Sequence, residues 1–195
     1  IVKTPKFSGV KLFENISLNE IRDYIDWTPF FQTWDLHGRY PNILEDTIVG
    51  KEAKKLLADA QEMLDKIIAE KWLTNKAVVG IWPANAVGED IEVYTDELRN
   101  KVAAKFFTIR QQQKKKAGIP NHSLVDFIAP KESGVKDYIG GFVVTAGIGI
   151  EEHIEQFEAD HDDYNSIMLK ALADRFAEAF TELMHEKVRK EIWGY

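Results

Sequence analysis

The sequence predicts an α+β domain in which a twisted, largely antiparallel sheet is flanked by long amphipathic helices. Apolar residues recur at helical spacing over 49–73 and again from 150 to 193. Four segments of strand type lie between these stretches, and strands and helices do not alternate regularly. With 195 residues, 45% of them hydrophobic, the chain is long enough for one sizeable core. We therefore expect one domain over residues 1–195.

The first helices are predicted from capping and proline signals. "SLNE" at 17–20 has the form of a capping box, in which Ser17 accepts from the backbone N–H of Glu20, so a short helix should run to about Ile25. "DWTPFFQTWDL" at 26–36 places Pro29 in a first helical turn. Four aromatic residues within eight positions of this segment indicate core or the wall of a pocket.

The pattern in the middle of the chain predicts a long helix followed by strands. Ala53, Leu56, Ala60, Leu64 and Ile67 are among the apolar positions of an amphipathic helix over 49–73. The polar connection over 110–121 is a loop, and the last apolar stretch should form two helices broken near 160–163. The predicted strands are 77–84, 90–94, 101–109, whose pattern also fits a helix, and 137–147.

Composition excludes several classes of function. A net charge of −7 and a pI near 5.3 argue against a nucleic-acid or anionic-membrane surface. No window approaches the roughly 18 apolar residues of a membrane span, and no signal-peptide pattern opens the chain, so we expect a cytoplasmic protein. The absence of cysteine removes disulfides, thiolate nucleophiles and Cys-ligated metals.

The two ends suggest a piece of a longer protein. The chain begins at Ile1 without a methionine, and it stops at "EIWGY" just after an apolar helical stretch. Trp193 and Tyr195 have no predicted partner there. We expect both ends to be cut.

Two E-x-x-H pairs, Glu158 with His161 and Glu182 with His185, have the spacing found in carboxylate-bridged di-iron bundles. Such a site also needs glutamates from two further helices and a four-helix bundle, which the strand-rich middle of the chain does not allow. We therefore expect no metal site.

A glycine turn, "TAGIG" at 145–149, stands between a strand and a helix, as a nucleotide-binding turn does. Glu152 occupies the place of the third glycine, and no parallel β–α–β unit follows. A strand-to-helix turn that needs a positive φ is the favoured interpretation.

An acidic column is predicted on the last long helix, where Asp174, Glu178 and Glu182 follow at i, i+4 and i+8. Arg175 can pair with Glu178 but cannot neutralise all three. The column is either a solvated face or a surface that meets a positive group. The apolar side of the same helix holds Leu169, Leu172, Ala173, Phe176, Phe180, Leu183 and Met184.

Seven blocks of sequence resemble, in order, the activation domain of cobalamin-dependent methionine synthase, and the resemblance covers nearly the whole chain. They are "DWTPFFQTWDLHGRYP", "VVGIWPANAVGEDIEVY", "IRQQ", "DFIAP", "DYIGGFVVT", "HDDYNSIMLKALADRFAEAF" and "HEKVRKEIWGY".

The resemblance implies a domain that binds S-adenosylmethionine and closes over the cobalamin-binding domain of the same enzyme after oxidation to cob(II)alamin. A flavodoxin-like reductant supplies an electron, and the methyl group of S-adenosylmethionine passes to the cobalamin. By motif match, Asp26 and Glu178 bind the ligand, and Asp174 faces the cobalamin domain. No catalytic side chain is implied, because positioning is the main requirement.

The resembled family also has a ligand-binding R-P-x-x-G-Y motif, which does not occur in this sequence. We expect the chain to be the first part of the domain, with an incomplete site and no activity as an isolated fragment. Two alternatives stay open: an independent S-adenosylmethionine-dependent methyltransferase built around "TAGIG", and a non-enzymatic acidic module that docks a partner protein.

Overall fold

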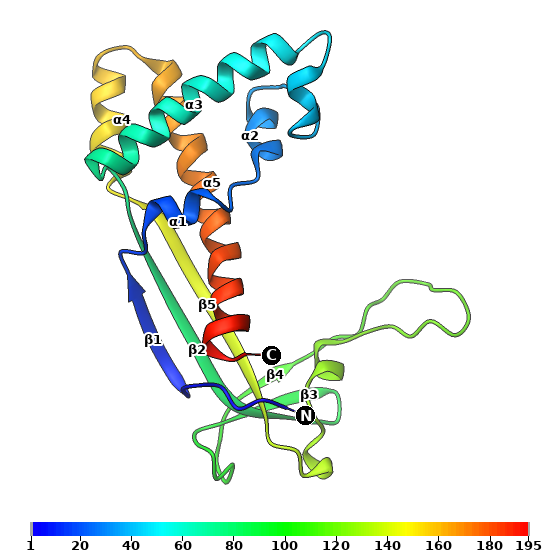
Figure 1. Ribbon diagram of the computed structural model, residues 1–195. Coiled ribbons are helices and arrows are strands. Elements are labelled where there is room, and N and C mark those ends of the chain that lie inside the picture. The colour runs from blue at the N-terminus through cyan, green and yellow to red at the C-terminus, as the bar shows by residue number, and fades with distance from the viewer. Residues whose placement is uncertain (1, 195) are drawn as a thin grey trace. The chain divides into compact units, whose positions relative to one another are not determined.

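A five-stranded sheet and two long helices organise the fold, which is α+β as predicted (Figure 1). The structure, a computed structural model, describes residues 2–194. The strand order is β1-β2-β3-β4, and β5 also pairs with β2. The pairs β2/β3 and β3/β4 are antiparallel. The strands are β1 (Gly9–Glu14), β2 (Thr74–Val87), β3 (Asp90–Tyr94), β4 (Val102–Phe107) and β5 (Asp137–Ile148).

The predicted long helices are confirmed. The helix expected over 49–73 is α3, which ends where Lys71 adopts a left-handed φ of 57°. The break expected near 160–163 separates α4 from α5. The helices are α1 (Leu18–Arg22), α2 (Trp27–Thr33), α3 (Gly50–Glu70), α4 (Ile150–Ala159) and α5 (Asp163–Lys187), which continues as a π-helix over Val188–Ile192.

The capping box predicted at 17–20 does not form. Ser17 stands at the N-cap of α1, but its side chain makes no capping hydrogen bond. The helix ends at Arg22 rather than near Ile25, because Asp26 already caps the next helix. The segment before Ser17 is instead held by Asn75, whose side chain bonds both the N–H and the C=O of Ile16.

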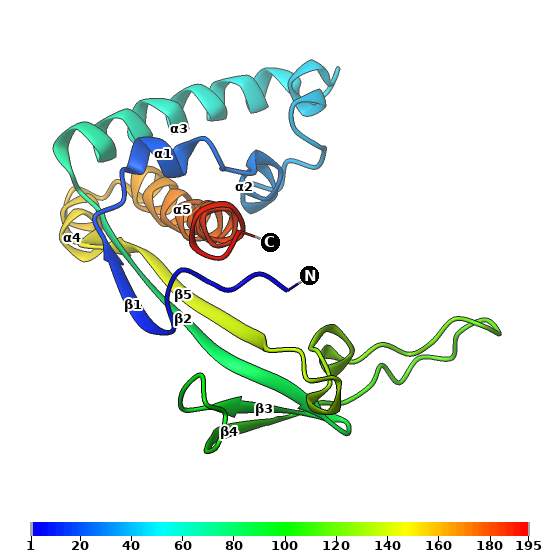
Figure 2. The ribbon, with the colours of Figure 1, turned by 60° about the horizontal axis from the view of Figure 1, so that its bottom comes forward.

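The chain forms two compact units, of which the larger comprises residues 12–77 and 143–185. In this unit α1, α2 and α3 lie around α5 (Figure 2). Three aromatic residues of the 26–36 segment belong to the core: Trp27, Phe30 and Phe31 are buried and meet edge to face. Trp34 is half-buried beside Tyr164, with ring centroids 5.0 Å apart. All seven apolar positions predicted for α5 are buried.

The "TAGIG" segment is a strand-to-helix turn, as predicted. Gly149 precedes α4 with a φ of +100°, and a Cβ there would lie 2.8 Å from the carbonyl oxygen of Trp72. Within residues 2–194 only helices follow β5. The methyltransferase alternative needs a parallel β–α–β unit after this turn. The antiparallel strand pairs and the absence of a described strand after β5 do not provide one.

The second unit comprises residues 1–11, 78–142 and 186–195. Its β2/β3 hairpin turns at Gly88, and its core includes Ala84, Ala86, Ile91, Val93 and Val125. Trp193 does have partners, contrary to expectation. Its indole N–H donates to the carbonyl of Lys3 at 2.8 Å, and its ring meets Tyr138 edge to face. Tyr195 lies outside the described residues.

None of the helices within residues 2–194 combines the length and the apolar composition that crossing a bilayer requires.

Candidate functional site

Asp26 is the N-cap of α2. Its backbone is extended, and its Oδ1 accepts a hydrogen bond of 2.9 Å from the Thr28 N–H. The cap satisfies one of the N–H groups that a helix start leaves without a partner. The carboxylate is exposed and keeps acceptor capacity on Oδ2. Asp26 is therefore fixed in position by the helix while remaining able to receive a donor from a ligand.

The acidic column on α5 is tied together by Arg175. This guanidinium, whose side chain is only 13% exposed, bonds Glu178 through Nη1 and Asp174 through Nη2. The predicted Arg175–Glu178 pair is confirmed, and Asp174 joins it. Glu182 is exposed one turn further on. Arg175 thus relieves the repulsion between two of the three carboxylates and restricts where they point.

Asp26 and Glu178 lie in the same unit, one at the start of α2 and the other in α5. No hydrogen bond joins the two carboxylates, since Asp26 bonds Thr28 and Glu178 bonds Arg175. The arrangement offers fixed acceptors and contains no nucleophile with an adjacent base. It suits the binding of ammonium or hydroxyl groups.

The first E-x-x-H pair, Glu158 and His161, does not share a helical face, although its spacing would place both residues on one face of a continuous helix. His161 lies beyond the end of α4 with a φ of 57°, and Glu158 pairs with Lys170 at 3.1 Å. Glu182 and His185 both lie in α5. In the described part of the chain, no three His, Asp or Glu side chains are grouped as metal ligands.

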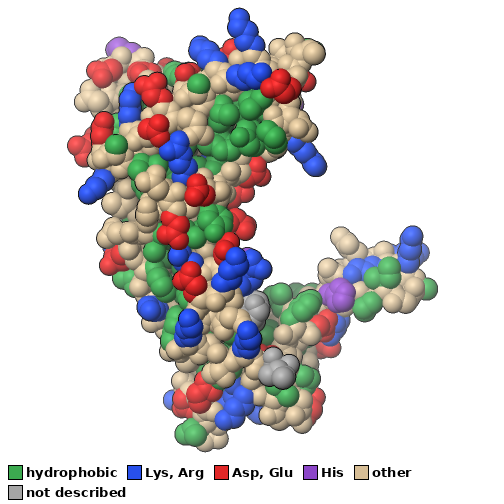
Figure 3. All heavy atoms as spheres, viewed as in Figure 1, with side chains coloured by type: hydrophobic (Ala, Val, Ile, Leu, Met, Phe, Trp, Pro, Cys, Tyr) green, Lys and Arg blue, Asp and Glu red, His purple; other side chains and the backbone are tan. Residues whose placement is uncertain are grey.

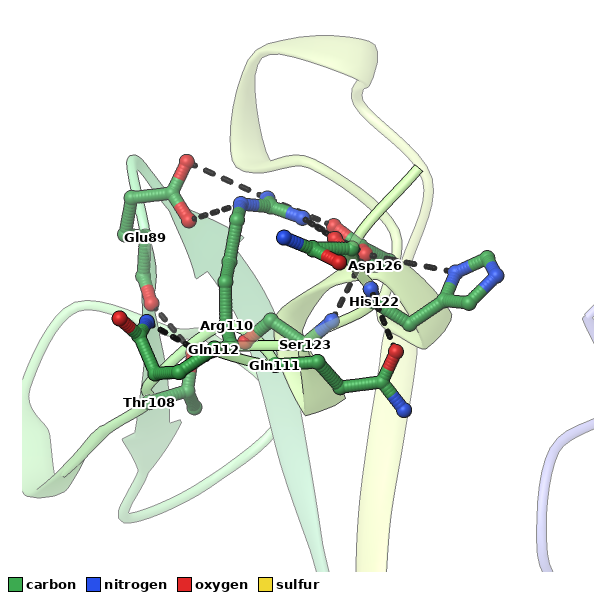
Figure 4. A network of polar contacts seen from close by, with 9 residues as sticks. Glu89, Thr108, Arg110, Gln111, Gln112, His122, Ser123 and Asp126 are labelled. Carbon is green, nitrogen blue, oxygen red and sulfur yellow. Dashed lines mark hydrogen bonds and ion pairs between the residues drawn. The ribbon is translucent and has the colours of Figure 1, made fainter. Parts of the chain in front are cut away.

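A network around Arg110, which the sequence did not predict, lies at the base of the loop over 111–121 (Figure 4). Arg110 makes two hydrogen bonds of 2.8 Å to the Asp126 carboxylate, and its Nε lies 2.8 Å from Glu89. Asp126 also accepts from the Ser123 N–H. The Arg110 hydrogen bonds, followed by that of Ser123, lower the pKa of Asp126 to about 2.

This network closes the base of the loop, because Arg110 and Asp126 are bonded across it. The Gln111 N–H also donates to the His122 carbonyl at 2.9 Å. Lys and Arg side chains are visible along the loop (Figure 3), which contains Lys114 and Lys116. "IRQQ" and "DFIAP" contain Arg110 and Asp126, but nothing in their spacing shows that the two residues meet.

A second feature that the sequence did not predict is a cavity of about 480 Å³, and this one lies in the larger unit. Tyr164 and Asp59 both line it, and the Tyr164 hydroxyl donates to Asp59 Oδ2 at 2.7 Å. Burial, reinforced by the Asp59 carboxylate, raises the pKa of Tyr164 to about 12. Trp72 stacks on His153 in the same unit, with ring centroids 4.2 Å apart.

Comparison with known proteins identifies the family. Residues 17–195 match the model of the activation domain of vitamin B12-dependent methionine synthase. A crystal structure of the MetH reactivation domain bound to AdoHcy is similar over the whole chain, with 54% sequence identity and a TM-score of 0.92. The present chain spans 59% of the length of that protein. The chain belongs to the family of vitamin B12-dependent methionine synthase activation domains.

Proposed function

We propose that the chain belongs to a domain that binds S-adenosylmethionine and supports the reductive reactivation of methionine synthase. The observation that carries the proposal is the 54% identity to a reactivation domain crystallised with AdoHcy. AdoHcy is S-adenosylmethionine without its transferable methyl group. A family member of the same fold thus binds the product of the proposed methyl transfer.

Asp26 and Glu178 are the proposed ligand-binding carboxylates. S-adenosylmethionine carries an ammonium group, a sulfonium centre and two ribose hydroxyls, and carboxylates interact favourably with each of these groups. The α2 cap holds Asp26, and Arg175 holds Glu178. Both carboxylates are therefore oriented before a ligand arrives, which reduces the ordering cost of binding.

The proposed chemistry requires positioning rather than a catalytic side chain. Cobalamin, carried by a neighbouring domain of the same enzyme, would supply the nucleophile that accepts the methyl group, and a flavodoxin-like reductant would supply the electron. The residues of this chain hold the ligand and orient its methyl group. Asp174, whose side chain is 72% exposed, is the proposed contact with the cobalamin domain.

The test is calorimetry with S-adenosylmethionine on the full-length activation domain. Asp26→Asn and Glu178→Gln should each weaken binding by about 1–3 kcal/mol, the usual range for a hydrogen bond to a charged group. Asparagine also caps helices well, so Asp26→Asn should leave α2 intact. The 195-residue chain alone should bind more weakly than the full-length domain, because it lacks the R-P-x-x-G-Y motif.

Glu182→Gln is the matched control, since Glu182 is an exposed acid on the same helix and has no proposed ligand contact. Its affinity should equal that of the wild type. Unchanged affinity in Asp26→Asn or Glu178→Gln, together with a lower melting temperature, would show that the carboxylate is structural.

A further inference from the structure

A small cavity in the unit formed by residues 1–11, 78–142 and 186–195 is lined by three cationic side chains and by no carboxylate. It encloses about 170 Å³. That is room for roughly six waters of about 30 Å³ each, and for a small oxyanion. The lining includes Asn85, Tyr94, Arg99, Lys131 and Lys136.

Arg99 is rigidly held at this cavity by neutral acceptors. Its side chain is only 11% exposed. Nη1 donates to the Ala84 carbonyl at 3.0 Å and to Asn85 Oδ1 at 2.7 Å, and Nη2 donates to the Asp137 carbonyl at 2.8 Å. The guanidinium also lies over the rings of Tyr94 and Tyr138. These contacts fix the position of the charge without neutralising it.

The Arg99 charge has no carboxylate within hydrogen-bond distance. Glu97 Oε2 forms an ion pair with Nη2 at 3.9 Å, which is longer than a hydrogen bond, and it accepts a hydrogen bond from the Tyr138 hydroxyl at 3.1 Å. Arg99 Nε is buried and has no partner. Buried charges in proteins are normally paired, and a guanidinium characteristically pairs with a carboxylate or a phosphate. Glu97 is therefore close enough for an ion pair with Arg99, but no carboxylate makes a hydrogen bond to this guanidinium.

Asn85 ties Arg99 to the segment that brings the two lysines. This amide is 4% exposed, and its Nδ2 donates to the carbonyls of Ala129 and Val135 at 2.9 and 2.8 Å. Its Oδ1 accepts from Arg99. Arg99 itself adopts a left-handed φ of 57°, a conformation that non-glycine residues hold only where surrounding contacts enforce it. The cavity is thus held by a buried polar framework.

The two lysines are exposed cations beside this fixed guanidinium. Lys131 Nζ donates a hydrogen bond to Glu92 Oε2 at 3.1 Å in an ion pair, and it lies 5.4 Å from the centre of the Tyr94 ring. Lys136 is exposed. Three cations facing one small space favour an anion with several acceptor oxygens and more than one charge. A phosphate group has both properties, whereas a single carboxylate has one charge and two oxygens.

We propose that this cavity binds phosphate, either as the free ion or as the phosphate group of a small metabolite, with Arg99, Lys131 and Lys136 as its cationic ligands. The site lies in a different unit from Asp26 and Glu178. It shares no residue with the proposed S-adenosylmethionine site.

The test is a two-dimensional NMR titration of the 195-residue chain with inorganic phosphate, with ionic strength held constant by chloride. The Arg99 Nε–H resonance and the amides of residues 134–136 should shift together and saturate. Ribose 5-phosphate forms a second arm. Tighter binding of ribose 5-phosphate assigns the site to a phosphorylated metabolite, and tighter binding of inorganic phosphate assigns it to the free ion.

The test variant is Lys131→Gln/Lys136→Gln, which leaves Arg99 and its buried partners in place and should weaken phosphate binding about tenfold or more. Its matched control is Lys114→Gln/Lys116→Gln, which removes the same charge from the loop over 111–121 and should stay within about twofold of wild type. Equal losses in the two variants would reduce the binding to non-specific attraction and overturn the proposal. Two other NMR results would also overturn the proposal. One is the absence of any saturable shift. The other is an Arg99 Nε–H shift that follows the ionisation of Glu97 and disappears in the Glu97→Gln variant.

Discussion

Some single hydrogen bonds in this chain hold side chains that remain accessible to solvent. Tyr164 is an example, because its hydroxyl reaches Asp59 across 105 positions of sequence while 41% of the residue remains exposed. Burial and the carboxylate both favour the protonated phenol, which raises its pKa to about 12. The stabilisation is fully present below the unfolded pKa of about 10 and is lost as the pH rises through about 12.

Removing this hydroxyl should destabilise the larger unit modestly. Tyr164→Phe is expected to lower the free energy of unfolding by about 0.5–1.5 kcal/mol at pH 7, the range for one hydrogen bond that water partly replaces. Urea denaturation gives the value. In an Asp59→Asn background the same substitution should have a smaller effect. Equal effects in both backgrounds would mean that the two groups do not interact in solution.

Elements with strong periodicity were predictable, and elements defined by distant partners were not. The boundaries of α3 and the break between α4 and α5 follow from local apolar spacing, which operates within one helix. β1 was not predicted, and four of its six residues are exposed. The predicted capping box does not form, and the backbone of the preceding Ile16 bonds Asn75, a partner 59 positions away.

The polar contacts also divide into those that local sequence predicts and those that it does not. The Arg175–Glu178 pair follows from the i, i+3 spacing of one helix and was predicted. Arg110–Asp126 and Arg99–Asn85 depend on how loops meet strands, which local sequence does not specify.

The turn before α4 provides a test at the scale of an element. Gly149→Ala should lower the free energy of unfolding by about 1–3 kcal/mol, because alanine rarely adopts a positive φ. Its Cβ would also lie 2.8 Å from the Trp72 carbonyl oxygen. Gly147→Ala is the matched control, since its Cβ would make an ordinary 3.7 Å contact with Ala173. Equally mild effects of the two substitutions in thermal melts would show that the turn relaxes freely.

At the scale of the whole molecule, the chain passes repeatedly between its two compact units. Residues 1–11, 78–142 and 186–195 form one unit, and residues 12–77 and 143–185 form the other. The proposed ligand carboxylates Asp26 and Glu178 both belong to the larger unit, formed by residues 12–77 and 143–185, although 152 positions separate them in the sequence. Asp174 belongs to this unit too, one turn before Glu178 on α5. The proposed function thus gives ligand binding and docking to separate acids of α5, Glu178 and Asp174.

Asp174 should affect docking and leave ligand binding unchanged. Its side chain is 72% exposed against 50% for Glu178, so a surface arriving over α5 would meet it readily. In the intact enzyme, Asp174→Asn should keep S-adenosylmethionine affinity within about twofold of wild type, because Glu178 keeps its Arg175 partner. Reductive reactivation should slow, because the proposed contact with the cobalamin domain loses its charge. Glu182 is an exposed acid two turns further along α5, so the Glu182→Gln variant should keep both the affinity and the reactivation rate of the wild type. A normal reactivation rate in Asp174→Asn would instead make Asp174 a solvated partner of Arg175.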